Sequence, residues 1–313
     1  HRLDGTRLRV AVFTNFTQDH LDYHGSMQAY WQAKAALFDW PGLEAVVLNL
    51  DDPRGRELAD AAGRRGLDAW TVSLGQQPAR LMATGINYGP QGLQWAVHEG
   101  EQIVPISTNL VGDYNASNLM GVLGVLRALG VPLVDAVAAC RDLLAVPGRM
   151  QRVAGAAVAP AVVVDYAHTP DALAKVLSAL RPMAEARGGR LWCVFGCGGN
   201  RDAGKRPLMA AAAEAGADCV IVTNDNPRDE DPQAIIDQVL AGLRDPAAIQ
   251  VTPDRAQAIT TAVCAAAPQD VVLVAGKGHE TYQEMRGNCL PFSDIEQAQQ
   301  ALAVRSVSRG SQI

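Results

Sequence analysis

Short, continuous apolar runs in the second half of the chain each end in a glycine-rich or charged loop. These runs are residues 161–164, 191–195, 219–222 and 270–275, and helical patterns separate them. A short run that is apolar throughout is typical of a strand buried on both faces, and strands that alternate with helices form a parallel sheet. The pattern therefore predicts a doubly wound, Rossmann-like α/β domain.

The loops that follow these runs carry glycines, histidines and charged side chains. In an open α/β sheet, ligands bind beyond the carboxyl ends of the strands, so we expect the loops to converge on one crevice. Two of the loops would contribute Arg201, Asp202, Lys205, Arg206, Asp225, Asn226 and Arg228. Any one loop could be an ordinary polar turn, but four at one sheet edge favour a site for a small, highly charged ligand.

The first half of the chain predicts a second α/β arrangement. Apolar runs at 8–13, 45–50 and 69–74 alternate with helical patterns and indicate parallel strands, whereas short alternating runs from 81 to 110 indicate antiparallel strands. A Pro-Gly pair at residues 147–148 marks the best boundary. We therefore predict a first domain over residues 1–148 with a mostly parallel sheet and an antiparallel portion, a second over 149–305, and a disordered tail over 306–313.

Composition and charge narrow the class of protein. The chain has 313 residues and a net charge of −6 without a basic run, which argues against nucleic acid as the main partner. Its apolar runs have the length of strands and are too short to span a membrane. The six cysteines form no C-x-x-C pair and are expected to be free thiols rather than a disulfide framework.

A lysine in an apolar helical stripe is the first chemical anomaly. The residues at helical spacing are Met27, Tyr30, Trp31, Lys34 and Phe38. This pattern predicts that Lys34 lies in the middle of a buried face, where an unpaired lysine is rare. Two interpretations are open: the side-chain stem packs while the amine reaches water, or the amine turns toward His20 and His24.

Seven motifs in order resemble the Mur ligase family, and within it the members that add meso-2,6-diaminopimelate. They are Asp19–His24 followed by Lys34, Asn115 with Asn118, Gly148–Met150, Asp165–Asp171, Gly196–Asp202, Asp225–Arg228 and Gly276–Glu280. The resemblance extends from His1 to about Val304. It implies an ATP-dependent amide ligase of peptidoglycan precursor synthesis, in which an acyl phosphate of UDP-MurNAc-L-Ala-D-Glu is attacked by an amine of diaminopimelate.

The resemblance also implies a metal site and a nucleotide site. Lys34, carbamylated by carbon dioxide, and His20 would be catalytic ligands of Mg²⁺, because a carbamate offers the oxygen ligands that this ion prefers. For the ATP molecule, the resemblance implies adenine contacts from Asn115 and Asn118, ribose contacts from Arg149 and Asp165, and a nearby His168.

For diaminopimelate, the resemblance implies binding by Arg201, Asp225, Asn226, Pro227, Arg228, Gly276 and Glu280. Diaminopimelate carries two carboxylates and two ammonium groups. Arginine forks suit its carboxylates, and Glu280 suits an ammonium group. The charge pattern of the sequence and that of the implied ligand therefore agree.

The resemblance further implies a monomeric enzyme of the bacterial cytoplasm that acts on small molecules, without a nucleic-acid or membrane partner. The family's uridine-nucleotide domain and its Gly-Lys-Thr phosphate loop do not occur in these residues. We therefore expect them upstream of His1, and we expect the chain alone to fold without catalysing ligation. Two alternatives are a ligase similar to folylpolyglutamate synthetase, against which Asp225–Arg228 argues, and a non-catalytic amino-acid-binding fragment.

The implied carbamate gives a testable expectation. In the active ligase, Lys34→Ala should abolish amide-bond formation because an oxygen ligand of Mg²⁺ is lost. A short exogenous carboxylate should restore part of the activity, which is checked by product formation with and without the carboxylate. Near-normal turnover of Lys34→Ala in carbon-dioxide-free buffer would contradict the metal-ligand role.

Overall fold

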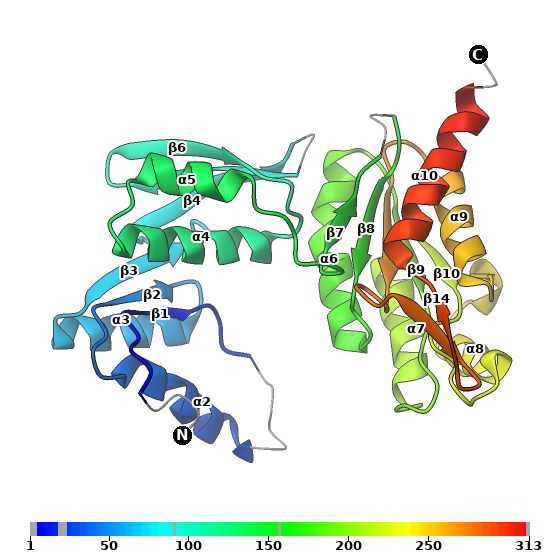
Figure 1. The fold of residues 1–313 in the computed structure, drawn as a ribbon, viewed down its shortest axis with the longest axis horizontal. Helices are drawn as coiled ribbons and strands as arrows, with labels where there is room; N and C mark the ends of the chain where they lie inside the picture. Colours follow the sequence, from blue (N-terminus) through cyan, green and yellow to red (C-terminus); the bar gives the residue numbers. More distant parts are fainter. Residues whose placement is uncertain (1–4, 18–23, 90–91, 156–157, 311–313) are drawn as a thin grey trace. The chain divides into compact units, whose positions relative to one another are not determined.

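The computed structural model describes residues 5–17, 24–89, 92–155 and 158–310. The chain forms two compact units, each built on its own six-stranded sheet (Figure 1). The first unit comprises residues 1–109 and 113–143, and the second comprises 110–112 and 144–313. In the part of the chain that the structure describes, no helix combines the length and hydrophobicity needed to cross a membrane.

The sheet of the first unit joins a parallel half to an antiparallel half. Its strands, in spatial order, are β1 (Val10–Phe13), β2 (Ala45–Asn49), β3 (Asp68–Ser73), β4 (Leu81–Tyr88), β5 (Leu93–Glu99) and β6 (Gln102–Ser107). Neighbours from β1 to β4 pair in parallel, and β4, β5 and β6 pair antiparallel. This confirms the predicted mostly parallel sheet with an antiparallel portion.

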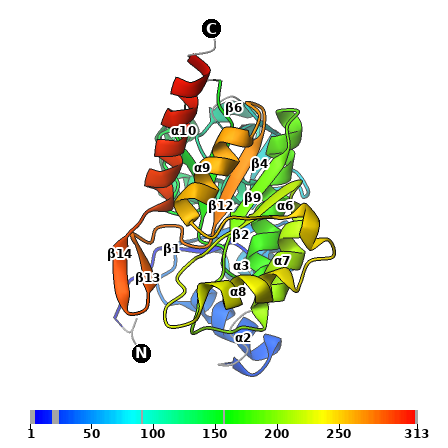
Figure 2. The same cartoon turned by 90° about the vertical axis from the view of Figure 1, so that its right-hand side faces the viewer.

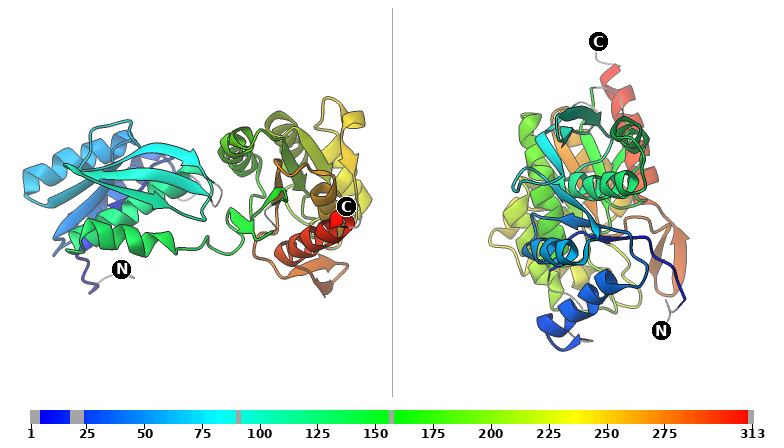
Figure 3. Two further views of the ribbon diagram at one scale, coloured as in Figure 1. Left: turned by 90° about the horizontal axis from the view of Figure 1, so that it is seen from above. Right: turned by 90° about the vertical axis from the view of Figure 1, so that its left-hand side faces the viewer.

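Helices cover both faces of the parallel half of this sheet (Figure 3). The helices of the unit are α2 (Met27–Ala35), the 3-10 helix η1 (Ala36–Asp39), α3 (Pro53–Arg65), α4 (Asp113–Ala128) and α5 (Leu133–Arg141). Val46 and Leu48 share a buried cluster with Leu58 of α3, whereas Val47 lies against Gly124 of α4. Since successive strand side chains point to opposite faces, the continuous apolar run of β2 reflects burial on both faces.

The sheet of the second unit has the doubly wound arrangement that the apolar runs predict. Its strands, in spatial order, are β11 (Gln250–Val251), β10 (Cys219–Val222), β9 (Leu191–Phe195), β12 (Val271–Ala275), β8 (Ala161–Asp165) and β7 (Gln151–Val153). All neighbours pair in parallel except β7, which runs antiparallel to β8 at the edge. The structure thus confirms the fold class and adds one antiparallel edge strand.

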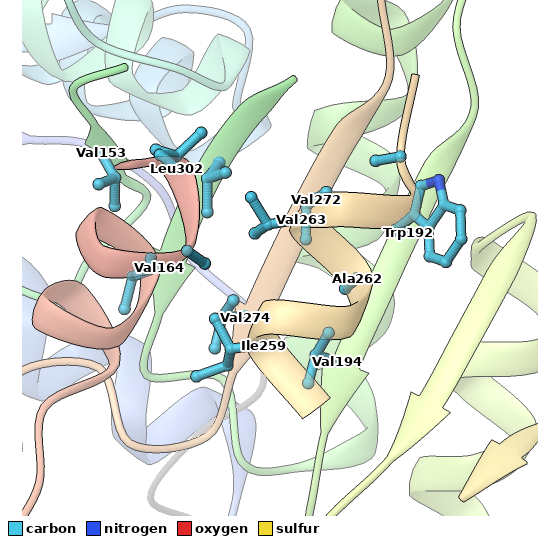
Figure 4. Close-up of a cluster of buried hydrophobic side chains, with 14 of the residues drawn as sticks. Val153, Val164, Trp192, Val194, Ile259, Ala262, Val263, Val272, Val274 and Leu302 are labelled. Atoms are coloured by element: carbon cyan, nitrogen blue, oxygen red, sulfur yellow. The ribbon is translucent and has the colours of Figure 1, made fainter. Parts of the chain in front are cut away.

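A buried cluster joins this sheet to α9 and α10 (Figures 2 and 4). The helices of the unit are α6 (Pro170–Ala186), α7 (Lys205–Gly216), α8 (Pro232–Leu240), the 3-10 helix η2 (Pro246–Ala248), α9 (Arg255–Ala265) and α10 (Asp294–Gly310). Ile259 and Val263 of α9 are fully buried against strand residues such as Val274. Full burial of one such side chain contributes roughly 1.5–3 kcal/mol, so the cluster fixes the strands whose ends carry the loops.

The end of the chain differs from the predicted disordered tail over residues 306–313. Helix α10 extends to Gly310, so residues 306–310 are helical, and 311–313 lie outside the described residues. Arg305, which is 3% exposed, donates hydrogen bonds to the carbonyls of Val263 and Cys264 at 2.6 and 2.8 Å. These bonds tie α10 to the end of α9, a long-range contact that polar composition does not reveal.

An ion pair is fully buried where α9 and α10 begin. Arg255 Nε and Nη2 donate to the two carboxylate oxygens of Asp294, each at 2.7 Å, and both side chains are 0% exposed. Burial by itself lowers the pKa of Arg255, but nearby carboxylates, Asp294 foremost, together outweigh it, and the net pKa is raised. Arg255 also donates to the carbonyls of Ala275 and Asn224, at the ends of two strand segments, so the pair holds both loops.

Removal of one partner of this pair should destabilise the chain strongly. We expect Arg255→Met to lower the free energy of unfolding by about 3–5 kcal/mol, because Asp294 becomes a buried, unpaired charge. Urea unfolding measures the change. The double variant Arg255→Met/Asp294→Leu is the control and should regain much of the loss, since neither charge remains. Equal losses in the single and double variants would assign the effect to packing instead.

Candidate functional site

A cavity of about 510 Å³ lies in the second unit, at the carboxyl ends of β8, β9, β10 and β12. It is lined by Tyr166, His168, Thr169, Gly196, Cys197, Gly198, Arg201, Asp202, Lys205, Asp225, Asn226, Arg228, Gly276, Glu280 and Tyr282. Four loops that are far apart in the sequence therefore meet around one space. The topology explains this, because parallel strands bring their carboxyl ends to the same edge of the sheet.

Six of the seven residues predicted to bind an amino acid line this cavity. They are Arg201, Asp225, Asn226, Arg228, Gly276 and Glu280. The seventh, Pro227, is buried, and its carbonyl oxygen would lie 1.9 Å from a Cβ placed on Gly199. Glycine at 199 is thus needed for the close approach of the loops after β9 and β10, and Pro227 contributes to loop packing rather than to the cavity wall.

A two-stranded hairpin holds the loop from Asp225 to Arg228. Its strands are β13 (Tyr282–Met285) and β14 (Asn288–Pro291) (Figure 2). Met285 of β13 forms an isolated β-bridge with Arg228. Gln283 donates through Nε2 to the carbonyl of Asp225 at 2.7 Å, and the backbone N–H of Glu284 donates to Asn226 Oδ1 at 3.0 Å. The hairpin therefore contacts several members of the predicted binding loop, a role that the sequence did not reveal.

Arg228 is restrained in both its backbone and its side chain. Its φ of 52° lies in the left-handed region that is uncommon for a residue with a side chain, and its backbone N–H and C=O bond to the hairpin at 3.0 and 2.6 Å. Nε donates to Glu284 Oε2 at 3.1 Å, and Nη1 donates to the carbonyl of Gly199 at 2.8 Å. Within the described residues, Nη2 has no partner, so this end of the guanidinium is open to a ligand.

The second arginine of the cavity lies close to the first. A Cβ on Gly198 would lie 3.0 Å from Arg228 Nη1 and 3.8 Å from Arg201 Cγ, so the glycine is flanked by both arginines. Arg201 is exposed, and within the described part of the chain it has no ion-pair partner. Both arginines thus line the cavity beside Gly198, and a guanidinium group is suited to an anionic group such as a carboxylate.

Carboxylates form the opposite charge in the cavity wall. Glu280 Oε2 accepts from Asn226 Nδ2 at 2.8 Å and from Lys277 Nζ at 3.1 Å. Asp225 Oδ2 would lie 2.7 Å from a Cβ on Gly276, whose φ is 121°. Glycine at 276 therefore leaves room for the Asp225 carboxylate, and the two acidic side chains can meet an ammonium group from the loops after β10 and β12.

Arg206 does not lie in the crevice, contrary to the sequence prediction. Its side chain is 1% exposed and donates to both carboxylate oxygens of Glu230, at 2.8 and 2.9 Å. It also donates to Gln238 of α8 and to the carbonyl of Gly198. As the second residue of α7, Arg206 points toward α8 rather than into the cavity, and it supports the loop from behind.

Two of the predicted nucleotide-binding residues gather around Tyr166. The Arg149 guanidinium carbon lies 4.6 Å from the centroid of the Tyr166 ring, and the His168 ring centroid lies 4.6 Å from it. His279 adds a third neighbour at 5.3 Å. Flat aromatic and guanidinium groups of this kind suit the planar and sugar parts of a nucleotide.

Asp165 supports this aromatic group through the backbone. Its two carboxylate oxygens accept hydrogen bonds from the N–H groups of Met150 and Ala167, both at 2.7 Å. Burial raises the pKa of Asp165, and these two hydrogen bonds offset part of the rise. The Asp165 side chain is thus engaged with the two segments that carry Arg149 and Tyr166.

Asn115 and Asn118 lie in the first two turns of α4, in the first unit. Asn115 is half-buried and Asn118 is exposed. Their spacing of three places them on neighbouring turns of one face, as predicted. They belong to a different unit from Arg149, Asp165 and His168.

The prediction that Lys34 lies on a buried face is wrong. Helix α2 ends at Ala35 and Phe38 belongs to η1, so the helical stripe does not continue past Lys34. The Lys34 side chain is exposed, and its Nζ lies 5.1 Å from the centroid of the Tyr30 ring, against which His24 stacks. His20 lies outside the described residues, and among those described no group of three His, Cys, Asp or Glu side chains could hold a metal.

Comparison with known families identifies both halves of the chain. Residues 1–126 match the Mur ligase middle domain, and residues 148–278 match the Mur ligase glutamate ligase domain. The chain belongs to the Mur ligase family. The two matched ranges correspond to the mixed sheet and to the doubly wound sheet, so the second range includes most of the candidate cavity.

Similar proteins within the family share most of this chain. A UDP-N-acetylmuramoyl-L-alanyl-D-glutamate–2,6-diaminopimelate ligase from Acidovorax sp. (strain JS42) is 59% identical over 305 residues, which are 97% of this chain and 60% of that protein. A solved structure of a ligase of the same name has a TM-score of 0.77 at 37% identity and covers 97% of this chain and 62% of its own. The chain thus spans about three fifths of the length of these Mur ligases.

A more distant Mur ligase shares the fold. The MurF ligase of Thermotoga maritima in complex with ADP has a TM-score of 0.64 at 16% identity, and the match covers 98% of this chain and 64% of that chain. The similarity extends the fold assignment over nearly all of the present sequence.

Proposed function

We propose that this chain binds ATP and meso-2,6-diaminopimelate for a ligase that joins the amino acid to UDP-MurNAc-L-Ala-D-Glu. The observation that carries the proposal is the cavity, whose lining combines Arg201 and Arg228 with Asp225 and Glu280. The Acidovorax relative, whose name states this reaction, supports the choice of substrate. The product would be a precursor of peptidoglycan.

The charges of the cavity suit diaminopimelate better than an amino acid with fewer ionic groups. Each carboxylate of the ligand needs a fixed cation once it is removed from water, because an unpaired buried charge is costly. Arg228 and Arg201 can hold one carboxylate from two loops, and their planar forks match its geometry. Asp225 and Glu280, which also line the cavity, can hold ammonium groups.

The residues of the cavity act mainly by positioning the amine that attacks. ATP, when bound, supplies the phosphoryl group that converts the glutamyl carboxylate of the acceptor into an acyl phosphate. With both ends of diaminopimelate held, the attacking amine loses most of its translational and rotational freedom before the reaction, which is a major source of rate acceleration. Burial raises the pKa of the Cys197 thiol in the cavity wall to about 12, which disfavours the reactive thiolate form.

For the nucleotide, the proposal assigns Arg149 and Asp165 to the ribose and Asn115 and Asn118 to the adenine. His168 is assigned to a position near the same nucleotide. The cluster around Tyr166 supports the first assignment, with Asp165 acting through the backbone. Mg²⁺ held by carbamylated Lys34 and by His20 belongs to the proposal on the family resemblance alone. The exposure of Lys34 is consistent with access by carbon dioxide, but the described residues form no complete ligand set.

The direct test is calorimetric titration of this chain with meso-diaminopimelate. We expect saturable binding, and weaker binding of L-lysine, which lacks one carboxylate. The absence of diaminopimelate binding to the folded chain would overturn the assignment of the cavity.

Arg228 should control the choice of amino acid. A hydrogen bond to a charged group contributes about 1.5–3 kcal/mol, so Arg228→Ala should lower kcat/KM of the active ligase for diaminopimelate by roughly 10- to 200-fold. The loss for lysine should be much smaller, because lysine lacks the second carboxylate. Steady-state kinetics with both amino acids measures the ratio.

Arg244→Ala is the matched control, since the Arg244 side chain is 90% exposed and lies outside the cavity lining. It should change neither rate. If Arg228→Ala reduced both rates equally, Arg228 would only shape the loop, and an unchanged preference would remove it from the site.

A further inference from the structure

A fully buried lysine lies directly behind the cavity and is not used by the proposed recognition of diaminopimelate. Lys277 follows β12, and its side chain is 0% exposed. It is not among the residues that line the cavity. Lysine is almost never fully buried unless it is paired, because an ammonium group is costly to remove from water. The groups that pair with the Lys277 ammonium group must therefore account for its burial.

The partners of Lys277 are recognition residues of the cavity. Nζ donates to Asn226 Oδ1 at 2.8 Å and to Glu280 Oε2 at 3.1 Å. On a further side, Nζ lies 5.6 Å from the centroid of the Tyr282 ring. Lys277 thus joins the loop after β10 to the loop after β12 through a single buried cation.

These contacts fix the orientation of both partners. Asn226 Oδ1 accepts from Lys277 and from the backbone N–H of Glu284, so its Nδ2 must point the other way, where it donates to Glu280 Oε2. Glu280 Oε2 consequently receives two hydrogen bonds. Within the described residues Oε1 has no partner, and the Glu280 side chain is 20% exposed at the cavity.

Arg228 is held in the same way as Glu280, with the charges reversed. Glu284 pairs with Arg228 Nε, as Lys277 pairs with Glu280 Oε2. In the cavity lining, the three cations Arg201, Lys205 and Arg228 are matched by the three anions Asp202, Asp225 and Glu280. Lys277 therefore restrains Glu280, and Glu284 restrains Arg228. Both restraining charges come from the segment 277–284.

We propose that Lys277 is a positioning residue for amino-acid recognition. It holds Glu280 and Asn226 so that the open Glu280 oxygen meets an ammonium group of the incoming amino acid. Its charge also offsets that of Glu280, so the wall does not repel the carboxylates of the ligand. The inference rests on the proposed function of the cavity and extends it to a residue that does not touch the substrate.

The test is Lys277→Met in this chain, titrated calorimetrically with meso-diaminopimelate and with L-lysine. We expect the Kd to rise by about 10-fold or more for both ligands, since both carry a side-chain ammonium group and the loss is that of a charged hydrogen-bond contact. Glu284→Gln is the matched comparison, because it changes the residue behind Arg228 instead. It should weaken the binding of diaminopimelate more than that of lysine.

A double-mutant cycle separates positioning from general damage to the fold. If Lys277 acts through Glu280, Lys277→Met/Glu280→Gln should bind no more weakly than Glu280→Gln alone. Additive losses, or unchanged binding by a folded Lys277→Met, would overturn the proposal. If Glu280→Gln itself left binding unchanged, the assigned role of Glu280 would fail, and the proposal for Lys277 with it.

Thermal unfolding of each variant shows whether it is folded. If Lys277→Met does not fold, Lys277→Gln replaces it in the cycle, since glutamine keeps a donor toward Asn226 but removes the charge. The same two outcomes then decide. A loss of binding that is coupled to Glu280→Gln supports the proposal, and losses that add overturn it.

Discussion

Charged side chains buried behind the cavity must be paired, and their pairing determines how the loops of the second unit are arranged. Arg206, Arg255 and Lys277 are among the largest side chains that are fully buried. Each makes bonds that cross from one loop or helix to another: Arg206 to Glu230 and Gly198, Arg255 to Asp294 and to two strand-end carbonyls, Lys277 to Asn226 and Glu280. Because unpaired buried charge is so costly, these networks leave the loops few alternative positions.

Sequence patterns predicted the elements that depend on burial. The four apolar runs became β8, β9, β10 and β12, since a strand covered on both faces needs apolar residues at every position. Convergence of their loops then followed from parallel topology, without knowledge of any side-chain contact. All of the residues expected in the crevice line the cavity except Arg206.

The same patterns failed where an element ended or a side chain had two directions available. The stripe through Lys34 assumed a helical period of 3.6 residues beyond Ala35, but the chain tightens there into η1. Arg206 differs from Lys205 by one position at the start of α7, which is enough to turn it from the cavity toward α8. The residue types alone determine neither where a helix ends nor in which direction a side chain at its start points.

The polar contacts that support the candidate site were the feature hardest to predict from the sequence. The β13–β14 hairpin is mostly exposed or half-buried, so hydrophobic periodicity does not reveal it, although it holds Asp225, Asn226 and Arg228. Lys277 lies in a recognised motif, yet its direction into the protein depends on Asn226 and Glu280 from two loops. Contacts of this kind join residues distant in sequence and leave no periodic signal.

Under the proposed function, the cavity distinguishes diaminopimelate from lysine by the charges that lysine leaves unpaired, rather than by shape. Lysine is smaller than diaminopimelate and would fit any space that admits it, so steric exclusion cannot reject it. It would, however, leave the guanidinium groups of Arg201 and Arg228 without a carboxylate in a partly desolvated site, and sites built for a polar group reject analogues that lack it. This penalty exists only if the arginines cannot swing back to other partners or to water. The bonds from Glu284 and Gly199 to Arg228 restrict that escape, which makes the supporting contacts as important for selectivity as the arginine itself.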